Sequence, residues 1–201
     1  MNLQDEFGDI DVYLFDQLLR ARIRTGMRVL DTGCGGGRNL VYSLRQGFEV
    51  WATDASPDAV AHVRGLVAAL APSLSSSRVR REPVECSSFD DRAFDVVISS
   101  AVLHFARDDE QFEAMVREMW RVLAPGGMLF VRLASSIGLE GARALGQNRF
   151  LLPDGSERYL VTAERLLALT ARMGGSLLDP LKTTVVHGQR SMTTWVVGKS
   201  P

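Results

Sequence analysis

Short apolar runs alternate along the chain with segments whose apolar residues recur at helical spacing. The apolar runs predict strands at 27–31, 49–54, 79–84, 94–98, 128–133, 183–186 and 192–197. The helical spacing predicts an N-terminal helix within residues 1–25 and further helices at 39–44, 57–70, 109–123 and 162–173. Strands that alternate with helices in this way form right-handed βαβ units. We therefore expect an α/β protein with a mostly parallel sheet, helices on both faces and an antiparallel pair of strands at the C-terminus.

Turn and capping residues mark where several of these elements begin and end. Ser56-Pro57-Asp58 supplies an N-cap, a proline at the first helical position and an acid in the first turn. Pro125-Gly126-Gly127 marks the end of the helix that starts after Asp108. Residues 134–161 contain several glycines and a Pro-Asp-Gly-Ser turn, so we expect a loop or hairpin insertion there.

The composition fits one folded domain over residues 1–201. The chain has 46% hydrophobic and 23% charged residues, and a domain of this length buries enough surface to fold without disulfides or metal ions. Cys34 and Cys86 lack metal-ligand spacing, so we expect no metal site.

Charge and hydropathy argue against two classes of partner. The formal net charge of -1 provides no field that would attract nucleic acid. No run approaches the roughly 18 apolar residues of a membrane span, and the N-terminus is acidic. We therefore expect a cytoplasmic monomer or homodimer that has neither nucleic acid nor a membrane as its partner.

A glycine-rich turn follows the first expected strand and reads Asp31-Thr32-Gly33-Cys34-Gly35-Gly36-Gly37. A dinucleotide fingerprint needs Gly-x-Gly-x-x-Gly, but its third glycine, counted from Gly33, falls on Arg38. A phosphate-binding P-loop needs Gly-Lys-Ser or Gly-Lys-Thr, which is absent from this turn. The turn therefore argues against an NAD-type oxidoreductase, which we retain only as a minor alternative.

The pattern Asp-x-Gly-x-Gly-x-Gly resembles the first motif of class I S-adenosylmethionine-dependent methyltransferases. Residues 94–104, Phe-Asp-Val-Val-Ile-Ser-Ser-Ala-Val-Leu-His, resemble the fourth-strand motif of this family. Residues 121–127, Arg-Val-Leu-Ala-Pro-Gly-Gly, resemble its fifth-strand motif. The resemblance implies a Rossmann-like seven-stranded sheet, S-adenosylmethionine as methyl donor and a small-molecule methyl acceptor.

Two carboxylates are placed to bracket this donor. Asp31 ends the first strand and suits the donor's amino group, while Asp54, 23 positions later at the end of the second strand, suits its ribose hydroxyls. For adenine, Glu85 or the backbone near Cys86 is a candidate, although Glu85 could equally be a solvated loop acid. With the family resemblance, the other expected donor contacts are Tyr13 as a lid residue and Gly33, Cys34, Gly35, Asn39, Ala55 and Ser99.

Methyl transfer from a sulfonium mainly requires positioning and a water-poor site. His104, just past the fourth strand, is the candidate base, and the alternative is a packed residue at a helix start. The sequence motifs that hold nucleobases in related enzymes are absent, which favours a small acceptor. We also expect the 134–161 insertion to lie on the substrate side. A donor-binding regulatory protein without turnover is the alternative function. The candidate acceptor-binding residues are Arg132, Arg149, Tyr159 and Arg190.

Overall fold

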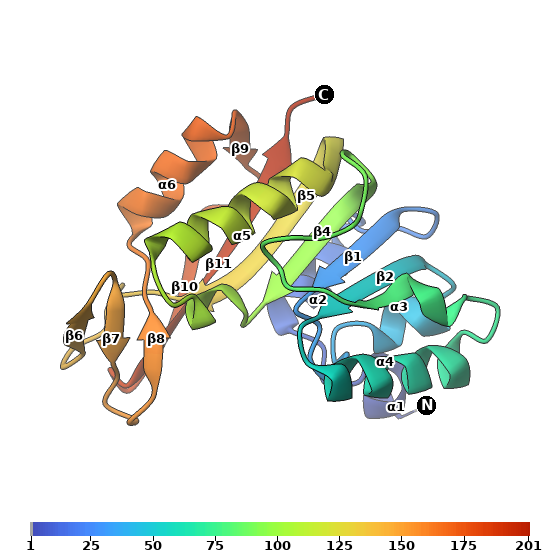
Figure 1. Ribbon diagram of the computed structural model, residues 1–201, viewed down its shortest axis with the longest axis horizontal. Helices are drawn as coiled ribbons and strands as arrows, with labels where there is room; N and C mark the ends of the chain where they lie inside the picture. The colour runs from blue at the N-terminus through green and yellow to red at the C-terminus, as the bar shows by residue number, and fades with distance from the viewer. Residues whose placement is uncertain (1) are drawn as a thin grey trace.

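The computed structural model describes residues 2–201 and centres on an eight-stranded sheet (Figure 1). Seven strands follow the order β10-β11-β5-β4-β1-β2-β3, and β9 pairs with β11. β1 to β5 pair in parallel, whereas β11 runs antiparallel to β5, β9 and β10. The predicted α/β fold, with its C-terminal antiparallel strand, is therefore confirmed. The strands are β1 (Arg28–Thr32), β2 (Glu49–Asp54), β3 (Val79–Arg81), β4 (Phe94–Ser100), β5 (Leu123–Ala134), β9 (Gly175–Leu177), β10 (Lys182–Val186) and β11 (Arg190–Lys199).

Helices cover both faces of the sheet, and each face has its own apolar core (Figure 1). Buried residues of α5 and α6 pack on one face, and those of α2, α3 and α4 pack on the other. None of the helices between residues 2 and 201 is long and apolar enough to cross a membrane. The helices are α1 (Leu3–Phe7), α2 (Val12–Leu19), α3 (Val41–Arg45), α4 (Pro57–Leu70), α5 (Asp109–Val122) and α6 (Ala163–Arg172), with short 3-10 helices η1 (Ser76–Arg78) and η2 (Leu103–Phe105).

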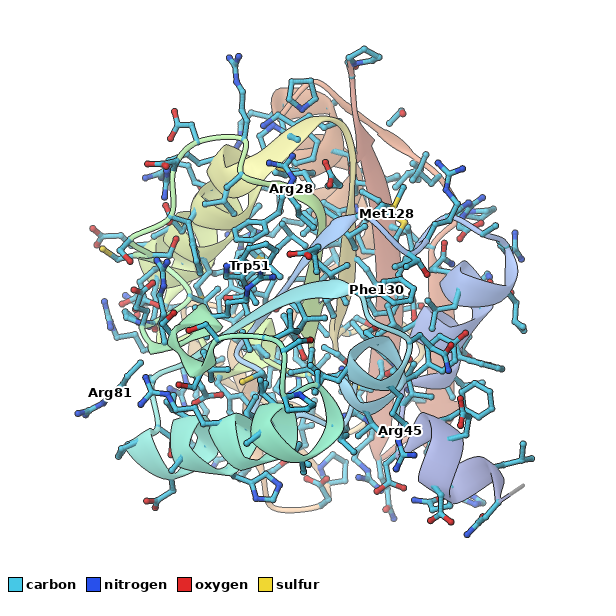
Figure 2. The ribbon with its side chains drawn as sticks, turned by 90° about the vertical axis from the view of Figure 1, so that its right-hand side faces the viewer. Arg28, Arg45, Trp51, Arg81, Met128 and Phe130 are labelled. Atoms are coloured by element: carbon cyan, nitrogen blue, oxygen red, sulfur yellow. The ribbon has the colours of Figure 1, made fainter. Side chains whose placement is uncertain are left out.

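Alternation along the strands divides the apolar residues between the two cores. Met128 and Phe130, two positions apart on β5, belong to the core beneath α2, α3 and α4 (Figure 2). Leu129 and Val131 belong to the core beneath α5 and α6. Because adjacent side chains of a strand point to opposite faces, a continuous apolar run supplies both cores.

β5 begins earlier than its sequence predicts. The expected strand starts at Met128 after a Pro-Gly-Gly helix stop, but α5 already ends at Val122 and β5 starts at Leu123. The pairing of β4 with β5 is irregular between Phe94 and Val96, and Gly126 has a φ of 75°. The Pro-Gly-Gly segment therefore forms a bulge within the strand.

The N-terminal segment forms two helices, because Gly8 ends α1 with a φ of 60° and Asp11 caps α2. α2 is attached to the C-terminal part of the chain. The buried carboxylate of Asp179 accepts hydrogen bonds from Gln17 Nε2 at 2.9 Å and Arg22 Nη1 at 2.8 Å. The Tyr13 hydroxyl lies 2.7 Å from Thr184 Oγ1 on β10. These contacts fix the N-terminal segment on the sheet.

The 134–161 insertion forms a small antiparallel sheet of β6 (Arg143–Gly146), β7 (Arg149–Leu151) and β8 (Glu157–Tyr159). This sheet lies apart from the central one in Figure 1. Tyr159 anchors it, because its ring stacks on Phe112 of α5 with centroids 4.7 Å apart and its hydroxyl donates to Asp109. The insertion therefore has three paired strands, which is more regular secondary structure than the expected loop or hairpin.

Candidate active site

A cavity of about 730 Å³ lies at the carboxyl ends of β1, β2 and β4. β1 lies between β2 and β4, and a reversal of strand order of this kind leaves a crevice beyond the strand ends. Its wall combines the segment before α2, the glycine turn, the ends of β2 and β4, the loop after β3, and η2 with α5. The lining residues are Asp9, Gly33, Cys34, Gly35, Gly36, Arg38, Asn39, Asp54, Ala55, Pro83, Val84, Glu85, Ser100, Ala101, Val102, Phe105, Gln111 and Met115.

The glycine turn is held by backbone hydrogen bonds and tight packing. The amides of Gly33 and Cys34 both donate to the Thr53 carbonyl, at 2.8 and 2.9 Å. Gly33 has a φ of 70°, and a Cβ there would lie 2.6 Å from Val102 Cγ1. Since valine has little freedom at its branched Cβ, only glycine fits this position. The turn thus presents bare backbone to the cavity.

Asp31 lies near the end of β1, two residues before Gly33; it is only 1% exposed and lies behind the residues that line the cavity rather than among them. Within the described part of the chain, its Oδ2 has no hydrogen-bond partner. Burial raises the pKa of this carboxyl to about 7, while the Arg38 guanidinium acts in the opposite direction. An unpaired buried oxygen is costly, so Asp31 is suited to a cationic ligand group such as an amino group.

Asp54 lies on the cavity wall at the end of β2, and its carboxylate is oriented by the backbone. Oδ2 accepts from the Gly35 amide at 2.8 Å, and Oδ1 accepts from the Ser56 amide at 2.9 Å. Each oxygen keeps a further lone pair that can accept from a hydroxyl. The neighbouring Ala55 also lines the cavity. The structure thus brings Asp54 to the same site as Gly33, Cys34 and Gly35, as the sequence predicts.

The far end of the cavity is partly apolar. Val84 and Met115 line it together with Glu85, whose Oε1 accepts from Gln111 Nε2 at 2.7 Å. Cys86 is exposed and lies outside the lining. Of the two predicted adenine contacts, Glu85 lines the cavity and Cys86 does not, and the role of Glu85 toward adenine stays a prediction.

Ser99 and Tyr13, both expected as donor contacts, lie outside the cavity lining. Ser99 is fully buried within β4, and the next residues, Ser100 to Val102, line the cavity instead. Tyr13 contacts β10 through Thr184, and the residue of the N-terminal segment that lines the cavity is Asp9. Asn39 does line the cavity, as expected, and is buried.

His104 lies outside the cavity lining and is 6% exposed. Its Nδ1 accepts a hydrogen bond from the Ala134 amide at 3.3 Å, and its ring packs on Phe105 with centroids 4.5 Å apart. Burial, helped by the Arg158 guanidinium, lowers the pKa of His104 to about 4. This environment corresponds to the packed alternative of the sequence analysis rather than to a base in contact with a ligand.

The four candidate acceptor-binding residues lie outside the cavity lining and have protein partners. Arg132 donates to Asp11 at 2.9 Å, and Tyr159 is buried against α5. Arg149 pairs with Glu157 at 2.6 Å, and Arg190 lies 3.8 Å from Asp154. Their positions near strand ends therefore did not identify the wall of the cavity.

The lining residues that the sequence-based site predictions missed include Asp9, Phe105 and Gln111, and also Gly36, Pro83, Val84, Ser100, Ala101, Val102 and Met115. Phe105 is 61% exposed, unusually high for a large apolar residue, and it directly follows the fourth-strand motif. The position of Phe105 next to this motif could have predicted that it lies at the cavity. Asp9 and Gln111 reach the cavity only through tertiary packing, which local sequence does not encode. Among residues 2–201, no cluster of candidate metal ligands occurs.

Comparison with known proteins relates the chain to methyltransferases. Residues 29–127 match the family model of a methyltransferase domain. The ubiquinone biosynthesis O-methyltransferase of Brucella anthropi is 31% identical over 166 residues, covering 79% of this chain and 64% of the relative. Its counterpart in Chelativorans sp. is 30% identical, covering 81% and 63%. The chain thus spans slightly less than two thirds of these relatives.

Solved structures share the fold at low sequence identity. An S-adenosylmethionine-dependent methyltransferase of Methanosarcina mazei has a TM-score of 0.71 at 19% identity, covering 91% of this chain and 97% of its own. The 1,6-didemethyltoxoflavin-N1-methyltransferase of Burkholderia thailandensis, solved with S-adenosylhomocysteine, has a TM-score of 0.71 at 18% identity, covering 100% and 82%. The family model, the relatives and the fold agree with the motif around Asp31, and together they support a class I S-adenosylmethionine-dependent methyltransferase.

Proposed function

We propose that the protein transfers a methyl group from S-adenosylmethionine to an oxygen atom of a small-molecule acceptor. The observation that carries this proposal is the buried, unpaired oxygen of Asp31, two residues before Gly33 of the glycine turn that lines the cavity together with Asp54. The choice of oxygen rests on the curated relatives, which are O-methyltransferases. A cavity of about 730 Å³ fits the size range of small-molecule sites.

The residues present fit the donor at each of its polar groups. Asp31 would pair with the donor's amino group, and Asp54 would accept from its ribose hydroxyls. Arg38 and Asn39, which follow the glycine turn, would face its carboxylate. The apolar side chains of Val84 and Met115, with Glu85 beside them, would surround adenine.

When bound, the donor supplies a methyl group that is already activated on a sulfonium. The chain's own task is then to position the two reactants and to exclude water from between them. Exposed Phe105 at the cavity supplies an apolar contact surface for the acceptor. No side chain is assigned as base, because His104 lies outside the lining.

Binding of S-adenosylhomocysteine, measured by titration calorimetry, tests the donor site. The Asp54→Ala variant should bind about 5- to 150-fold more weakly, since charged hydrogen bonds contribute about 1 to 3 kcal/mol. Asp58→Ala, an exposed acid one turn later that lies outside the cavity lining, is the matched control and should bind normally. Tight binding of NAD, or unchanged affinity in Asp54→Ala, would contradict the proposal.

A donor-binding protein without turnover is the second candidate function, and it is favoured by the position of His104 away from the cavity. Transfer of labelled methyl groups to a panel of phenols, thiols, amines and carbon acids separates the two. Labelled phenol ethers would support the proposal. Donor binding without any labelled product would support the second candidate.

We also propose that the protein acts as a monomer or homodimer in the cytoplasm, without nucleic acid. Its near-neutral charge supports the last point. Analytical ultracentrifugation with and without duplex DNA or RNA tests both the oligomeric state and the binding of nucleic acid. An oligomer larger than a dimer, or sedimentation of protein and nucleic acid together at physiological salt, would contradict the proposal.

A further inference from the structure

Asp11 is a buried acid that joins the N-terminal segment to the cavity wall. It caps α2, since its Oδ1 accepts from the Tyr13 amide at 3.0 Å. Its Oδ2 accepts from the Ser100 hydroxyl at 3.2 Å and from Arg132 Nη1 at 2.9 Å. The same Oδ2 lies 3.6 Å from Arg38 Nη2. The Asp11 side chain has no exposed surface.

The partners of Asp11 include residues from two other parts of the cavity wall, the segment after the glycine turn and the end of β4. Its own amide donates to Asn39 Oδ1 at 3.0 Å, and Arg38 Nη2 in turn donates to the Ser100 hydroxyl at 3.0 Å. Arg38, Asn39 and Ser100 all line the cavity, as does Asp9, two residues before Asp11. A single carboxylate thus connects the glycine turn, the end of β4 and the segment that covers the cavity.

The charges around Asp11 are unequal. Two guanidinium groups, Arg38 and Arg132, approach one carboxylate, and Arg132 makes the shorter contact. The Arg38 side chain is 43% exposed at the cavity, so most of its donors are free to face a ligand. Contacts of Nη2 with Ser100 and Asp11 thus hold one side of the Arg38 guanidinium at the cavity wall.

We propose that Asp11 is a positioning residue of the donor site, which acts by holding Arg38 and Ser100 on the cavity wall and Asp9 across it. This inference rests on the proposed function, because the ligand that Arg38 faces is the donor. A helix cap alone would explain the contact with Tyr13. It would not explain why the second oxygen, Oδ2, contacts Ser100 at the end of β4 and lies close to Arg38, which follows the glycine turn.

A double-mutant cycle with Asp11→Asn and Arg38→Gln tests this proposal, with S-adenosylhomocysteine affinity measured by calorimetry. Asparagine keeps an oxygen that can cap α2 but lacks the charge that holds Arg38. Each single variant should bind about tenfold more weakly, as expected for one charged hydrogen bond. The double variant should bind no more weakly than the weaker single variant, because both changes remove the same interaction.

Asp16→Asn is the matched control, because Asp16 lies on the same helix and pairs with Arg20 at 2.8 Å away from the cavity lining. It should bind normally. Asp11→Ser, which also caps a helix, replaces the asparagine variant in the cycle if that variant does not fold.

The outcomes separate the inference from the function on which it rests. A wild-type protein that does not bind S-adenosylhomocysteine would contradict the proposed function. Normal binding by the Asp11 variant, or affinity losses that simply add in the double variant, would overturn the role of Asp11 while leaving the donor site intact.

Discussion

At the scale of single residues, Asp31 makes ligand binding dependent on pH. Burial raises the pKa of its carboxyl to about 7, and a cationic group is attracted only to the ionised form. The ionised fraction rises roughly eightfold between pH 6 and pH 7.5 for a group with this pKa. We therefore expect S-adenosylhomocysteine to bind several-fold more tightly at pH 7.5, as measured by calorimetry at both values. Asp31→Asn should show a weaker and nearly pH-independent affinity.

The same raised pKa affects stability in the opposite direction. The folded state holds the Asp31 proton more tightly than the unfolded state, so stability falls as pH rises from about 4 through 7. Without ligand, Asp31→Asn should therefore be more stable than the wild type at pH 8, by about 1 to 4 kcal/mol. Urea unfolding at pH 8 and pH 5 measures this difference, and a variant that is less stable at pH 8 would contradict it.

His104 provides a prediction about structure rather than chemistry. His104→Ala leaves the Ala134 amide without its partner and removes a buried ring, so the variant should lose about 1 to 3 kcal/mol of stability. Its affinity for S-adenosylhomocysteine should stay unchanged. Thermal unfolding and calorimetry measure the two effects, with exposed His62→Ala as control. Slow methyl transfer by a fully stable His104→Ala would instead support a base.

Site residues could be predicted where sequence neighbours are also spatial neighbours. Asp31 and Asp54 end adjacent parallel strands, so their motifs place them at one end of the sheet. Arg149 and Arg190 also lie near turns, yet each finds an acid of its own nearby. Which arginine faces the cavity depends on packing between distant segments, as Arg38 and Asp11 show.

At the scale of elements, local signals located most boundaries. Ser56 caps α4 and Pro57 is its first residue, as the sequence predicts, and the predicted β2 has the observed bounds. Errors occurred where tertiary pairing overrides local preference. The helix does end before Pro125, but β5 already starts at Leu123, which pairs with Phe94 of β4, and the strand continues through the bulge at Pro125. Similarly, the strands of the insertion stabilise one another although each is short.

The insertion depends on one anchor that can be removed. Tyr159→Phe deletes the hydroxyl that donates to Asp109, so we expect a loss of about 1 kcal/mol. Protease should then cut residues 143–159 faster than the wild type, as followed by mass spectrometry. Arg143→Gln, at an exposed position of β6, should be cut at the wild-type rate.

Acid should weaken the same anchor. Hydrogen bonding, chiefly from the Tyr159 hydroxyl, lowers the pKa of Asp109 to about 2. A lowered pKa of this kind stabilises the fold above about pH 4, and the contribution disappears as pH falls toward 2. Protease resistance of the insertion at pH 4 and pH 2.5, tested with an acid-active protease, should reflect this difference.

At the scale of the whole molecule, the two apolar cores share one sheet, so we expect a single cooperative unfolding transition. A ligand that binds only the folded state adds about 2.7 kcal/mol when present at 100 times its Kd. S-adenosylhomocysteine at that concentration should raise Tm by several degrees in scanning calorimetry. NAD at the same concentration should leave Tm unchanged, and an equal shift with NAD would point to a dinucleotide site.

The attachment of α2 to Asp179 and Thr184 also bears on how the protein is made. A ribosome produces Gln17 long before Asp179, so the nascent N-terminal segment lacks these partners until residues 179 and 184 have been translated. Chains released before residue 179 therefore carry the glycine turn with an N-terminal segment, including Asp9, that these contacts do not hold.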